Sequence, residues 1–467
     1  MPLPESGLDL AVPRRIHVTN VGGAGMSAVA TLLVQMGHRV SGHDPADHTP
    51  FVEPLRDLGV VVTTGMERQP LSAEVEAVVV STATPTDDPD VVDATDREIP
   101  VLHRSKALAA ICQQRSVVAV AGTHGKTTTS ALLATLLEGA GAQPGWVIGA
   151  RVAGLGSSAA WGGSGPLVVE ADESDGTFLA LGAASAIVTN VEADHLEHWG
   201  SEEALRSAFH DFVAAIEGPT VLCLDDPGSA DLVRSARHPV TYGIGVASDY
   251  LVSGVSQQGT GVAFTVAHDG QSVEVQVPAA PGIHNARNAA AVLALAHQLG
   301  VPLAQGAEAL GAFRGVARRF EVRGEVGGVV LVDSYDHLPT EVAAALAAAR
   351  GGGWARVVCC FQPHRFSRTA SLWRAFADAF VDTDLLVITD IYPAGERARP
   401  GVRGKLIVDA VLDAHPRQRV VWLPTLGDTA AYLTVTLRPG DLCITLGAGD
   451  LTSVPDVLIE RLAERLP

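Results

Sequence analysis

Short apolar runs alternate with Ala- and Leu-rich segments along the chain, and they fall into three groups. Each run has the length of a buried strand, and the segments between the runs repeat apolar residues at helical spacing. The first group contains RIHVTNV from Arg15, a helical pattern over residues 27–36, and AVVVST from Ala77. Such alternation is typical of parallel sheets covered by helices, so the pattern predicts an α/β fold.

The second and third groups repeat this arrangement. In the second group, VVAVAGTHGKTTTS begins at Val117, PLVVEADESD at Pro166 and VLCLDD at Val221. The third group follows Arg318 and contains VVLVDSYDH, ARVVCCFQPHR, TDLLVITDIYPAGE and DLCITLGAGD. Because each group can close its own core, we expect three domains, covering residues 1–110, 111–316 and 317–467.

Composition narrows the class of protein. The 467-residue chain is 47% hydrophobic and 5% aromatic, which is typical of a well-folded α/β protein. Its formal net charge of -19 argues against a nucleic-acid partner, since phosphate backbones are bound by basic surfaces. The five cysteines form no C-x-x-C pair, which favours reduced, packed thiols. The sequence shows no signal-like or membrane-spanning segment, so we expect a cytoplasmic protein that acts on small molecules.

The most informative motif is the turn after the strand-like run at Val117. A Gly-Lys-Thr-Thr sequence from Gly125 opens a helical pattern, so backbone N–H groups at the helix start can face phosphates. Lys126 can reach the terminal phosphates, and the Thr127 hydroxyl can hold Mg²⁺. A strict G-x-x-x-x-G-K-[ST] motif needs glycine at position 120, where this chain has Val120, so the match is to a shorter loop from Gly122. The sequence predicts a nucleoside triphosphate site.

A second glycine-rich turn follows the first strand-like run. Gly22, Gly23 and Gly25 approximate a dinucleotide fingerprint, and Asp44 follows at the end of the next strand. Asn20 occupies the first glycine position and tolerates a positive φ better than most residues. This turn predicts a nucleotide diphosphate site and does not distinguish NAD from UDP.

Polar clusters follow further strands of the second and third groups. Because ligands of open α/β sheets bind at the carboxyl ends of strands, these clusters are candidate sites. Two acidic clusters suit Mg²⁺, while the alternative is solvated loop ends or helix caps. Their members are Glu170, Asp172, Glu173 and Asp175, and then Asn190, Glu192, Asp194 and His195. The third group supplies Asp333, Ser334, Tyr335, Asp336 and His337, followed by His364, Arg365 and Arg368, where arginines suit carboxylate or phosphate recognition.

Taken together, the segments GGAGMS, AGTHGKTTT, EADESD, TNVEADH, GVARRFE, FQPHRFSRT and YPAGE resemble the Mur ligases. The resemblance covers nearly the whole chain in the family's order and is nearest to members that join L-alanine to UDP-N-acetylmuramate. It implies an N-terminal Rossmann-like domain for the UDP-sugar, a central P-loop-type ATPase domain, and a C-terminal Rossmann-like domain for the amino acid. It also implies that ATP phosphorylates the sugar's lactyl carboxylate and that the amine attacks the acyl phosphate.

The resemblance also implies roles for single residues. ATP and two Mg²⁺ ions are the expected cofactors, and the enzyme is expected to be a monomer or homodimer. The expected metal residues are Thr127, Glu173 and His195, and the catalytic ones Lys126, Glu173, His195, His337 and Arg365. Expected ATP contacts are Gly122, Thr123, His124, Gly125, Lys126, Thr127, Thr128, Asn288, Arg319 and Ser334. Expected UDP-sugar contacts are Gly22, Gly23, Ala24, Gly25, Met26, Asp44 and Ser81, and expected amino-acid contacts are Tyr335, His337, His364, Arg365 and Arg368.

The chain departs from the family pattern at five positions. The family has glycine at Asn20, arginine at Ile283, and Asp-Asp-Tyr-Gly-His-His-Pro-Thr-Glu where this chain reads DSYDHLPTE. Ser334 thus replaces an acid expected at the ATP ribose, and Leu338 replaces a second histidine. Asp336 either turns outward or adds a negative charge to the amino-acid pocket. Three alternatives therefore stay open: a Mur-like ligase with altered substrates, a non-catalytic nucleotide-binding protein, and an NAD-dependent oxidoreductase.

Overall fold

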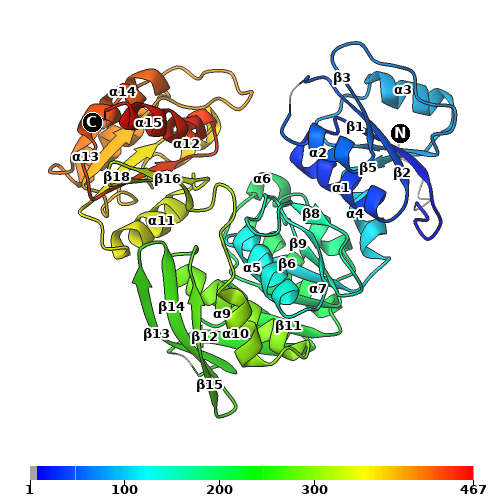
Figure 1. Cartoon of the computed structure of the whole chain (residues 1–467), viewed down its shortest axis with the longest axis horizontal. Helices are drawn as coiled ribbons and strands as arrows, with labels where there is room; N and C mark the ends of the chain where they lie inside the picture. Colours follow the sequence, from blue (N-terminus) through cyan, green and yellow to red (C-terminus); the bar gives the residue numbers. More distant parts are fainter. Residues whose placement is uncertain (1–7, 48, 246, 466–467) are drawn as a thin grey trace. The chain divides into compact units, whose positions relative to one another are not determined.

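The computed structural model describes residues 8–47, 49–245 and 247–465, and its α/β fold confirms the sequence prediction (Figure 1). The chain divides into two compact units. The first unit contains the chain up to Leu251 together with Asn288–Ala309, and the second contains Val252–Arg287 and the chain from Leu310. Within the described residues, no helix combines the length and apolarity needed to span a bilayer.

The first sheet is parallel throughout and has the strand order β3-β2-β1-β4-β5. Its strands are β1 (Arg15–Thr19), β2 (Arg39–Asp44), β3 (Val61–Thr64), β4 (Ala77–Val80) and β5 (Val101–His103). The helices are α1 (Ala24–Gln35), α2 (Val52–Asp57), α3 (Pro89–Asp96) and α4 (Arg104–Cys112). Helix α1 begins three residues earlier than the helical pattern predicts, directly after the glycine-rich turn. The turn therefore lies at the carboxyl end of β1 and at the start of a helix.

Seven further strands of the first unit lie in the order β12-β11-β10-β6-β9-β7-β8. They are β6 (Val117–Ala121), β7 (Gly145–Val147), β8 (Ala159–Ala160), β9 (Leu167–Glu170), β10 (Ser185–Val188), β11 (Pro219–Cys223) and β12 (His238–Ile244). The helices of this region are α5 (Lys126–Gly139), α6 (Leu196–Trp199), α7 (Glu202–Ala215) and α8 (Pro227–Asp231). Most of α9 (Ile283–Gln298) and of α10 (Leu303–Leu310) also belongs to the first unit. Every residue of β6 is buried, and β6 pairs in parallel with β9 and β10. The loops after these three strands therefore meet at one edge of the sheet.

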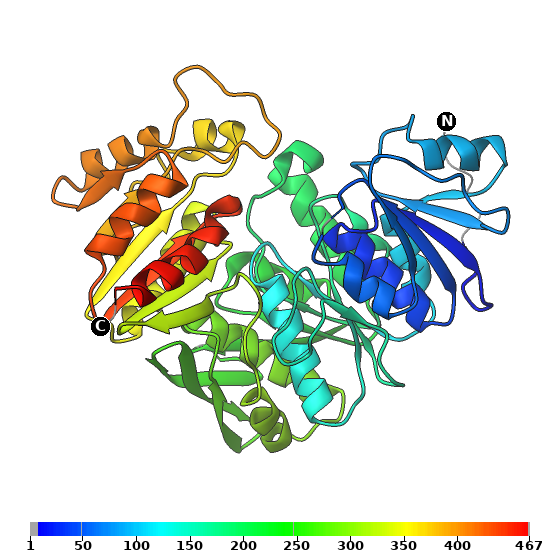
Figure 2. The ribbon, with the colours of Figure 1, turned by 45° about the horizontal axis from the view of Figure 1, so that its top comes forward.

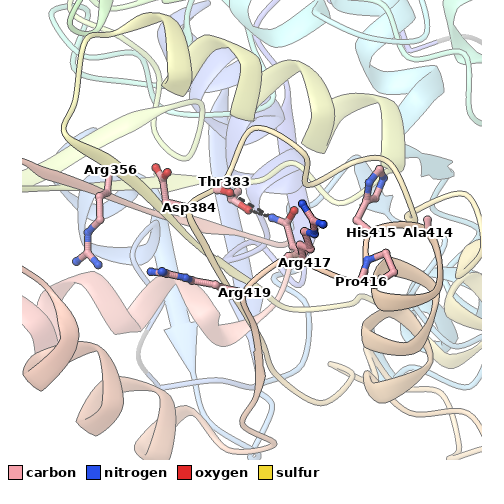
Figure 3. A pocket seen from close by; sticks show the side chains of 9 residues that line it. Arg356, Thr383, Asp384, Ala414, His415, Pro416, Arg417 and Arg419 are labelled. Atoms are coloured by element: carbon pink, nitrogen blue, oxygen red, sulfur yellow. Dashed lines mark hydrogen bonds between the residues drawn. The ribbon is translucent and has the colours of Figure 1, made fainter.

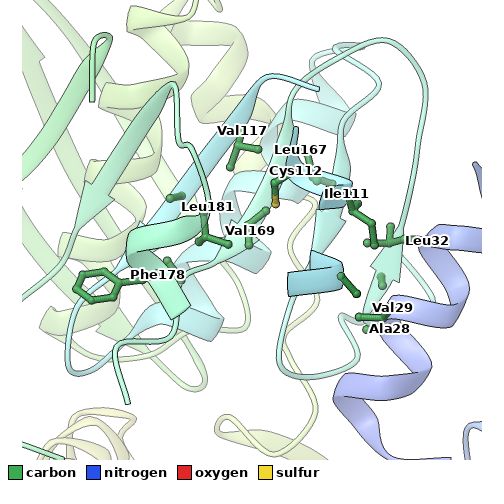
Figure 4. Close-up of a cluster of buried hydrophobic side chains, with 14 of the residues drawn as sticks. Ala28, Val29, Leu32, Ile111, Cys112, Val117, Leu167, Val169, Phe178 and Leu181 are labelled. Atoms are coloured by element: carbon green, nitrogen blue, oxygen red, sulfur yellow. The ribbon is translucent and has the colours of Figure 1, made fainter. Parts of the chain in front are cut away.

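An apolar cluster joins helix α1 to this second sheet (Figure 4). Ala28, Val29 and Leu32 of α1 belong to the same cluster as Ile111 and Leu167, and each is at most 5% exposed. Burial of apolar surface contributes roughly 25 cal/mol per Å², so this cluster stabilises the contact between the two sheets of the first unit.

Three further strands, which the sequence pattern did not predict, follow β12 along the chain. They are β13 (Tyr250–Gln258), β14 (Gly261–His268) and β15 (Gln271–Val277). Strands β14 and β15 form a hairpin in which His268 pairs with Gln271. The two turn residues, Asp269 and Gly270, have φ angles of +44° and +76°. An Asp-Gly turn of this kind matches the twist of paired strands, so this dipeptide was the available sequence signal.

The third sheet has the order β16-β17-β21-β18-β19-β20 and is parallel except for the edge strand β16. Its strands are β16 (Glu321–Val326), β17 (Val329–Ser334), β18 (Arg356–Phe361), β19 (Leu385–Ile388), β20 (Val420–Trp422) and β21 (Asp441–Leu446). Its helices are α11 (Pro339–Gly351), α12 (Phe366–Leu372), α13 (Lys405–Ala414), α14 (Leu426–Thr436) and α15 (Val454–Ala463), seen in yellow to red in Figure 2. Two separate apolar clusters form, with Cys359 in one and Cys360 in the other, because neighbouring strand residues face opposite sides. All five cysteines are buried and no disulfide joins any of them, as expected for reduced, packed thiols.

Candidate active site

A tight loop between β6 and α5 has the geometry of a phosphate cradle. Gly122 and Gly125 have φ angles of +131° and +82°, which residues with a side chain rarely adopt. The segment after β10 holds the loop, since Asn190 Oδ1 accepts the N–H of His124 at 2.8 Å and Asn190 Nδ2 donates to the His124 carbonyl at 3.0 Å. The first N–H groups of a helix have no partner within the helix, so those at the start of α5 can bind an anion.

Lys126 lies across this loop and pairs with Glu173. Its Nζ lies 2.9 and 2.8 Å from the two carboxylate oxygens and donates to the Gly122 and Thr123 carbonyls at 2.7 and 3.1 Å. The Glu173 side chain is 1% exposed. Burial raises the pKa of its carboxyl, while the Lys126 charge opposes that shift. The Lys126 ammonium therefore lies beside the phosphate loop, paired with the buried Glu173 carboxylate.

Thr127 contacts a different acid from the one that the sequence analysis assigned to it. Its hydroxyl donates to Glu170 Oε1 at 2.7 Å, at the end of β9, and the N–H of Gly149 donates to the other Glu170 oxygen at 2.6 Å. Glu173 lies three residues beyond the end of β9, and its carboxylate contacts Lys126 instead of Thr127. Hydroxyl and carboxylate oxygens are ligands that Mg²⁺ prefers, with phosphates completing its shell. Thr127 and Glu170 therefore fit a nucleotide-bound Mg²⁺.

His195 lies at the start of α6. It has a φ angle of +52°, and its Nε2 lies 3.5 Å from Asp194 Oδ2. Trp199 of the same helix donates its Nε1–H to the Glu173 carbonyl at 3.0 Å, so the two predicted metal segments adjoin. Over the described part of the chain, no three His, Cys, Asp or Glu side chains converge as a metal site. A metal contact of His195 stays a prediction.

Asn288 of α9 packs against the phosphate loop. A Cβ atom added to Gly125 would lie 3.2 Å from both polar atoms of the Asn288 amide, which is itself buried at 6% exposure. The structure thus brings the predicted adenine contact to the phosphate loop, although 162 positions separate it from Lys126 in the sequence.

The N-terminal glycine-rich turn is held by Asp44, the last residue of β2. Asn20 has a φ angle of +54°, which confirms that it supports the turn in place of glycine. Asp44 accepts the N–H of Gly22 at 2.8 Å and that of Ala46 at 2.9 Å. Gly23 and Ala24 are exposed at the start of α1 and are available to a ligand. A ribose contact of Asp44 stays a prediction, and in this structure its carboxylate closes the turn.

Two other residues predicted for the UDP-sugar have contrasting surroundings. Met26 is 4% exposed and its side chain belongs to the apolar core, so any contact with the sugar nucleotide would come from its backbone, and that contact stays a prediction. The hydrophobic effect favours this placement on the inner face of an amphipathic helix. Ser81 lies at the opposite side of the turn, where its hydroxyl and Asn20 both contact Thr84 Oγ1, each at 3.3 Å.

In the second unit, four predicted residues form a row of side chains at the carboxyl ends of β17 and β18. The Tyr335 and His337 rings are 5.4 Å apart, and the His337 and His364 rings are 5.6 Å apart. Arg368 Nη1 lies 3.0 Å from His364 Nδ1. Burial lowers the pKa of His364 to about 4, with the charges of His337, Arg368 and Arg365 adding to the shift. Burial also lowers the pKa of His337, so both imidazoles are neutral at pH 7.

Arg365 has a strained backbone at the start of α12. Its φ and ψ of +68° and 141° lie in a region that side chains disfavour. Its N–H donates to the Tyr392 carbonyl at 2.9 Å, and the Tyr392 ring stacks parallel to His364 at 5.9 Å. Tyr392 therefore fixes the neighbouring His364 and Arg365. Its YPAGE segment carries part of the family resemblance, but Tyr392 itself was not among the predicted site residues.

Ser334 and Asp336 face each other at the end of β17. The Ser334 hydroxyl donates to Asp336 Oδ2 at 2.5 Å and accepts the N–H of Phe320 at 3.0 Å. Asp336 therefore does not turn outward, and that interpretation is wrong because the serine hydroxyl holds its carboxylate. Ser334 is 1% exposed and bonded on both sides, which argues against its predicted contact with the ribose.

A pocket of about 700 Å³ lies elsewhere in the second unit (Figure 3). Arg356 opens β18, Asp384 precedes β19 and Arg419 precedes β20, so the pocket lies at the amino edge of the sheet. The row from Tyr335 to Arg368 lies at the carboxyl edge, where open α/β sheets bind ligands. None of the predicted site residues lines this pocket.

Three residues of the site were missed as site residues. Glu170 and Asn190 belong to polar clusters that the sequence analysis identified, but only pairing of β6 with β9 and β10 brings them to the phosphate loop. Tyr392 follows β19, where its position after a buried strand was the available signal.

The chain matches three family descriptions in sequence order. Residues 15–116 match "Mur ligase family, catalytic domain", residues 120–296 match "Mur ligase middle domain", and residues 318–449 match "Mur ligase, glutamate ligase domain". Together these matches cover most of the described chain.

Similar proteins match over nearly their whole length. The UDP-N-acetylmuramate–L-alanine ligase of Kineococcus radiotolerans is 44% identical, with 97% of each chain covered. The ligase of the same name from Anaeromyxobacter sp. is 43% identical, with 96% of this chain and 97% of the relative covered. Among solved structures, the UDP-N-acetylmuramate–alanine ligase of Thermotoga maritima is 28% identical with a TM-score of 0.82, covering 97% of this chain and 100% of that chain.

Proposed function

The chain belongs to the Mur ligase family, and we propose that it joins L-alanine to the lactyl carboxylate of UDP-N-acetylmuramate in an ATP-dependent reaction of peptidoglycan precursor synthesis. Full-length identity of about 40% to ligases of that name supports the substrates. The single structural observation that carries the proposal is the phosphate loop with Lys126 and Thr127 at the start of α5.

The first step needs a carboxylate to become an acyl donor. A free carboxylate has no good leaving group, and transfer of the ATP γ-phosphoryl group to its oxygen creates an acyl phosphate and ADP. The N–H groups at the start of α5 and the Lys126 ammonium bind the phosphate oxygens on which negative charge accumulates. Thr127 and Glu170 would hold Mg²⁺, which neutralises charge on the β- and γ-phosphates. A second ion near Glu173 and His195 is part of this proposal.

In the second step, the amine of L-alanine attacks the acyl phosphate and inorganic phosphate leaves. The amine must lose a proton to attack, and the neutral imidazole of His337 is the candidate acceptor. Arg365 and Arg368 suit the alanine carboxylate because a guanidinium can form paired hydrogen bonds with it. We assign Tyr335 and His364 to the wall of the same pocket.

The remaining assignments complete the proposal. The exposed start of α1 binds the UDP-sugar diphosphate, and Asn288 approaches adenine. Domain boundaries lie at residues 1–110, 111–316 and 317–467, and the enzyme acts in the cytoplasm as a monomer or homodimer.

The other functions account for fewer residues. An NAD-dependent oxidoreductase uses only the N-terminal turn and leaves the Lys126–Glu173 pair without a role. A Mur-like ligase with another amine stays the second candidate, because Asp336 and Leu338 depart from the family pattern beside Tyr335 and His337.

A reaction panel tests these functions directly. The protein is incubated with ATP, Mg²⁺, UDP-N-acetylmuramate and one amino acid at a time, and ADP, phosphate and product mass are measured. We expect the largest rate with L-alanine. Product with another amino acid alone would select the second candidate, and NAD binding by calorimetry without any response to UDP-N-acetylmuramate would overturn the ligase.

A further inference from the structure

The turn before β16 carries two strained residues. Arg318 and Phe320 have φ angles of +59° and +49°, on either side of Arg319. A left-handed conformation costs roughly 1–2 kcal/mol for each residue with a side chain, so the turn persists only where other contacts hold it. Phe320 is buried, with 9% of its surface exposed, and its N–H makes a buried hydrogen bond.

This turn places two arginines on one aromatic ring. The Arg318 and Arg319 guanidinium carbons lie 4.9 and 5.4 Å from the centre of the Tyr335 ring. The Tyr335 N–H donates to the Arg318 carbonyl at 2.8 Å, so the turn and the end of β17 are fixed together. Arg319 is the proposed ATP contact, and Tyr335 is the proposed amino-acid contact.

The acceptor for the Phe320 N–H is the Ser334 hydroxyl, and Asp336 sets that hydroxyl's direction. A serine hydroxyl has one hydrogen, and here it is donated to Asp336 Oδ2 at 2.5 Å. The lone pairs of Ser334 Oγ are thereby turned to Phe320, whose N–H donates at 3.0 Å. A bond to an ionised carboxylate also polarises the hydroxyl and strengthens it as an acceptor.

We propose that Asp336 is a positioning residue, which acts through the Ser334 hydroxyl to hold the Arg318–Phe320 turn and so places Arg319 and Tyr335 for ATP and the amino acid. Asp336 itself touches neither ligand in this assignment. The effect of Asp336 on kinetics rests on the proposed ligase function. The relay itself, which is the pair of hydrogen bonds that links Asp336 through Ser334 to the Phe320 N–H, does not depend on that function.

The charged groups around Asp336 make the relay sensitive to pH. Glu341 of α11 accepts the N–H groups of His337 and Leu338 at 3.1 and 3.2 Å and adds a second negative charge. Burial and the negative charge of Glu341 together raise the pKa of Asp336 to about 6, against the opposing positive charge of Arg319. Since the carboxylate form orients Ser334, the relay is strong above about pH 6 and weakens as the pH falls through that value.

Hydrogen exchange at the Phe320 amide tests the relay without any substrate. We expect its protection to fall in the order wild type, Asp336→Asn, Asp336→Ala, because asparagine offers a neutral acceptor and alanine none. Below about pH 6, protection in the wild type should approach that of Asp336→Asn, which should not change with pH. Ser334→Ala should lose the same protection, and adding Asp336→Ala to it should have no further effect.

Kinetics test the positioning role. In Asp336→Ala we expect the Michaelis constants for ATP and L-alanine to rise roughly tenfold with a smaller change in kcat, since a charge-assisted bond is lost. A merely structural defect would lower the active fraction and leave both Michaelis constants unchanged. Asp456→Asn is the matched control, because Asp456 is an exposed residue of α15 that pairs with Arg323 of β16.

The outcomes are separable. A wild-type protein without ligase activity would remove the proposed function and leave the exchange experiment valid. Phe320 exchange that is the same in wild type, Asp336→Asn and Ser334→Ala would overturn the relay, as would additive effects of Ser334→Ala and Asp336→Ala. Asp336→Asn keeps the side-chain shape, so the test does not depend on the folding of the alanine variant.

Discussion

Buried charges at single residues decide both stability and chemistry in this protein. Lys126 and Glu173 are 14% and 1% exposed and neutralise each other beside the phosphate loop. Removing one member of a buried pair leaves the other charge without compensation, which is more costly than losing the attraction alone. Lys126, the proposed catalytic lysine, is therefore also needed to balance the buried Glu173, and substitutions must separate the two roles.

We predict that Lys126→Ala lowers ligation by several orders of magnitude and also destabilises the first unit by roughly 3–5 kcal/mol. The second effect arises because Glu173 stays buried with no counter-charge. Lys126→Ala combined with Glu173→Gln should regain most of the lost stability and none of the activity. Calorimetric unfolding and an ADP-release assay measure the two effects.

Lys405→Ala serves as the control for the lysine substitution, because Lys405 pairs with Asp409 at the surface with 54% of its side chain exposed. Exposed pairs of this kind contribute about 0–1 kcal/mol. Near wild-type turnover in the folded double variant would contradict the assignment of Lys126.

At the scale of elements, helix α5 combines ordinary helical packing with an unusual start. Its apolar residues from Ala131 to Leu137 are buried in the first unit. Gly125 precedes the helix with a φ of +82°, and Gly141 follows it with a φ of +77°. Both glycines adopt a left-handed backbone that would strain any other residue, but only Gly125 has Asn288 against it. Substituting each glycine in turn therefore separates the effect of backbone strain from an effect on the phosphate loop.

We predict that Gly125→Ala and Gly141→Ala each cost roughly 1–2 kcal/mol of stability, since both place a side chain in the left-handed region. Only Gly125→Ala should raise the Michaelis constant for ATP, because its Cβ would lie 3.2 Å from the Asn288 amide and narrow the phosphate loop. Unfolding by urea and ATP-dependent kinetics check both parts. Equal kinetic effects of the two substitutions would show that strain in α5, and not the loop itself, controls nucleotide binding.

At the scale of the whole molecule, the stability of the fold depends on pH wherever the folded and unfolded chains bind different numbers of protons. His364 has a folded pKa of about 4, below its ordinary value of 6.5. The unfolded chain therefore binds more protons between these values, so this contribution to stability is present above pH 6.5 and is lost as the pH falls toward 4. Asp336 acts in the opposite direction, because its raised pKa means that the folded chain binds its proton more tightly than the unfolded chain does. This contribution to the stability of the folded protein is present at low pH and is lost as the pH rises through about 6.

We predict that His364→Gln flattens the loss of stability between pH 6.5 and 4, since glutamine keeps a polar side chain and does not titrate. Melting temperatures of wild type and variant across this range measure the effect. His415→Gln is the control, because His415 lies on the surface beside Asp378. Parallel curves for wild type and His364→Gln would mean that His364 is not held neutral in the folded protein.

The sequence by itself determined the α/β fold, the phosphate loop and the membership of a family, because strand-length apolar runs and glycine turns are local features. It also indicated a positive φ at Asn20, which the structure confirms. Tertiary structure alone decided which acid meets which partner. Glu170 and Glu173 are three residues apart in one motif, yet one bonds Thr127 and the other Lys126. Likewise, the inward direction of Asp336 depends on Ser334 and on the turn at Phe320, which lies fourteen residues before Ser334. Pairing of distant strands and burial select these partners, and neither is encoded in the spacing of a motif.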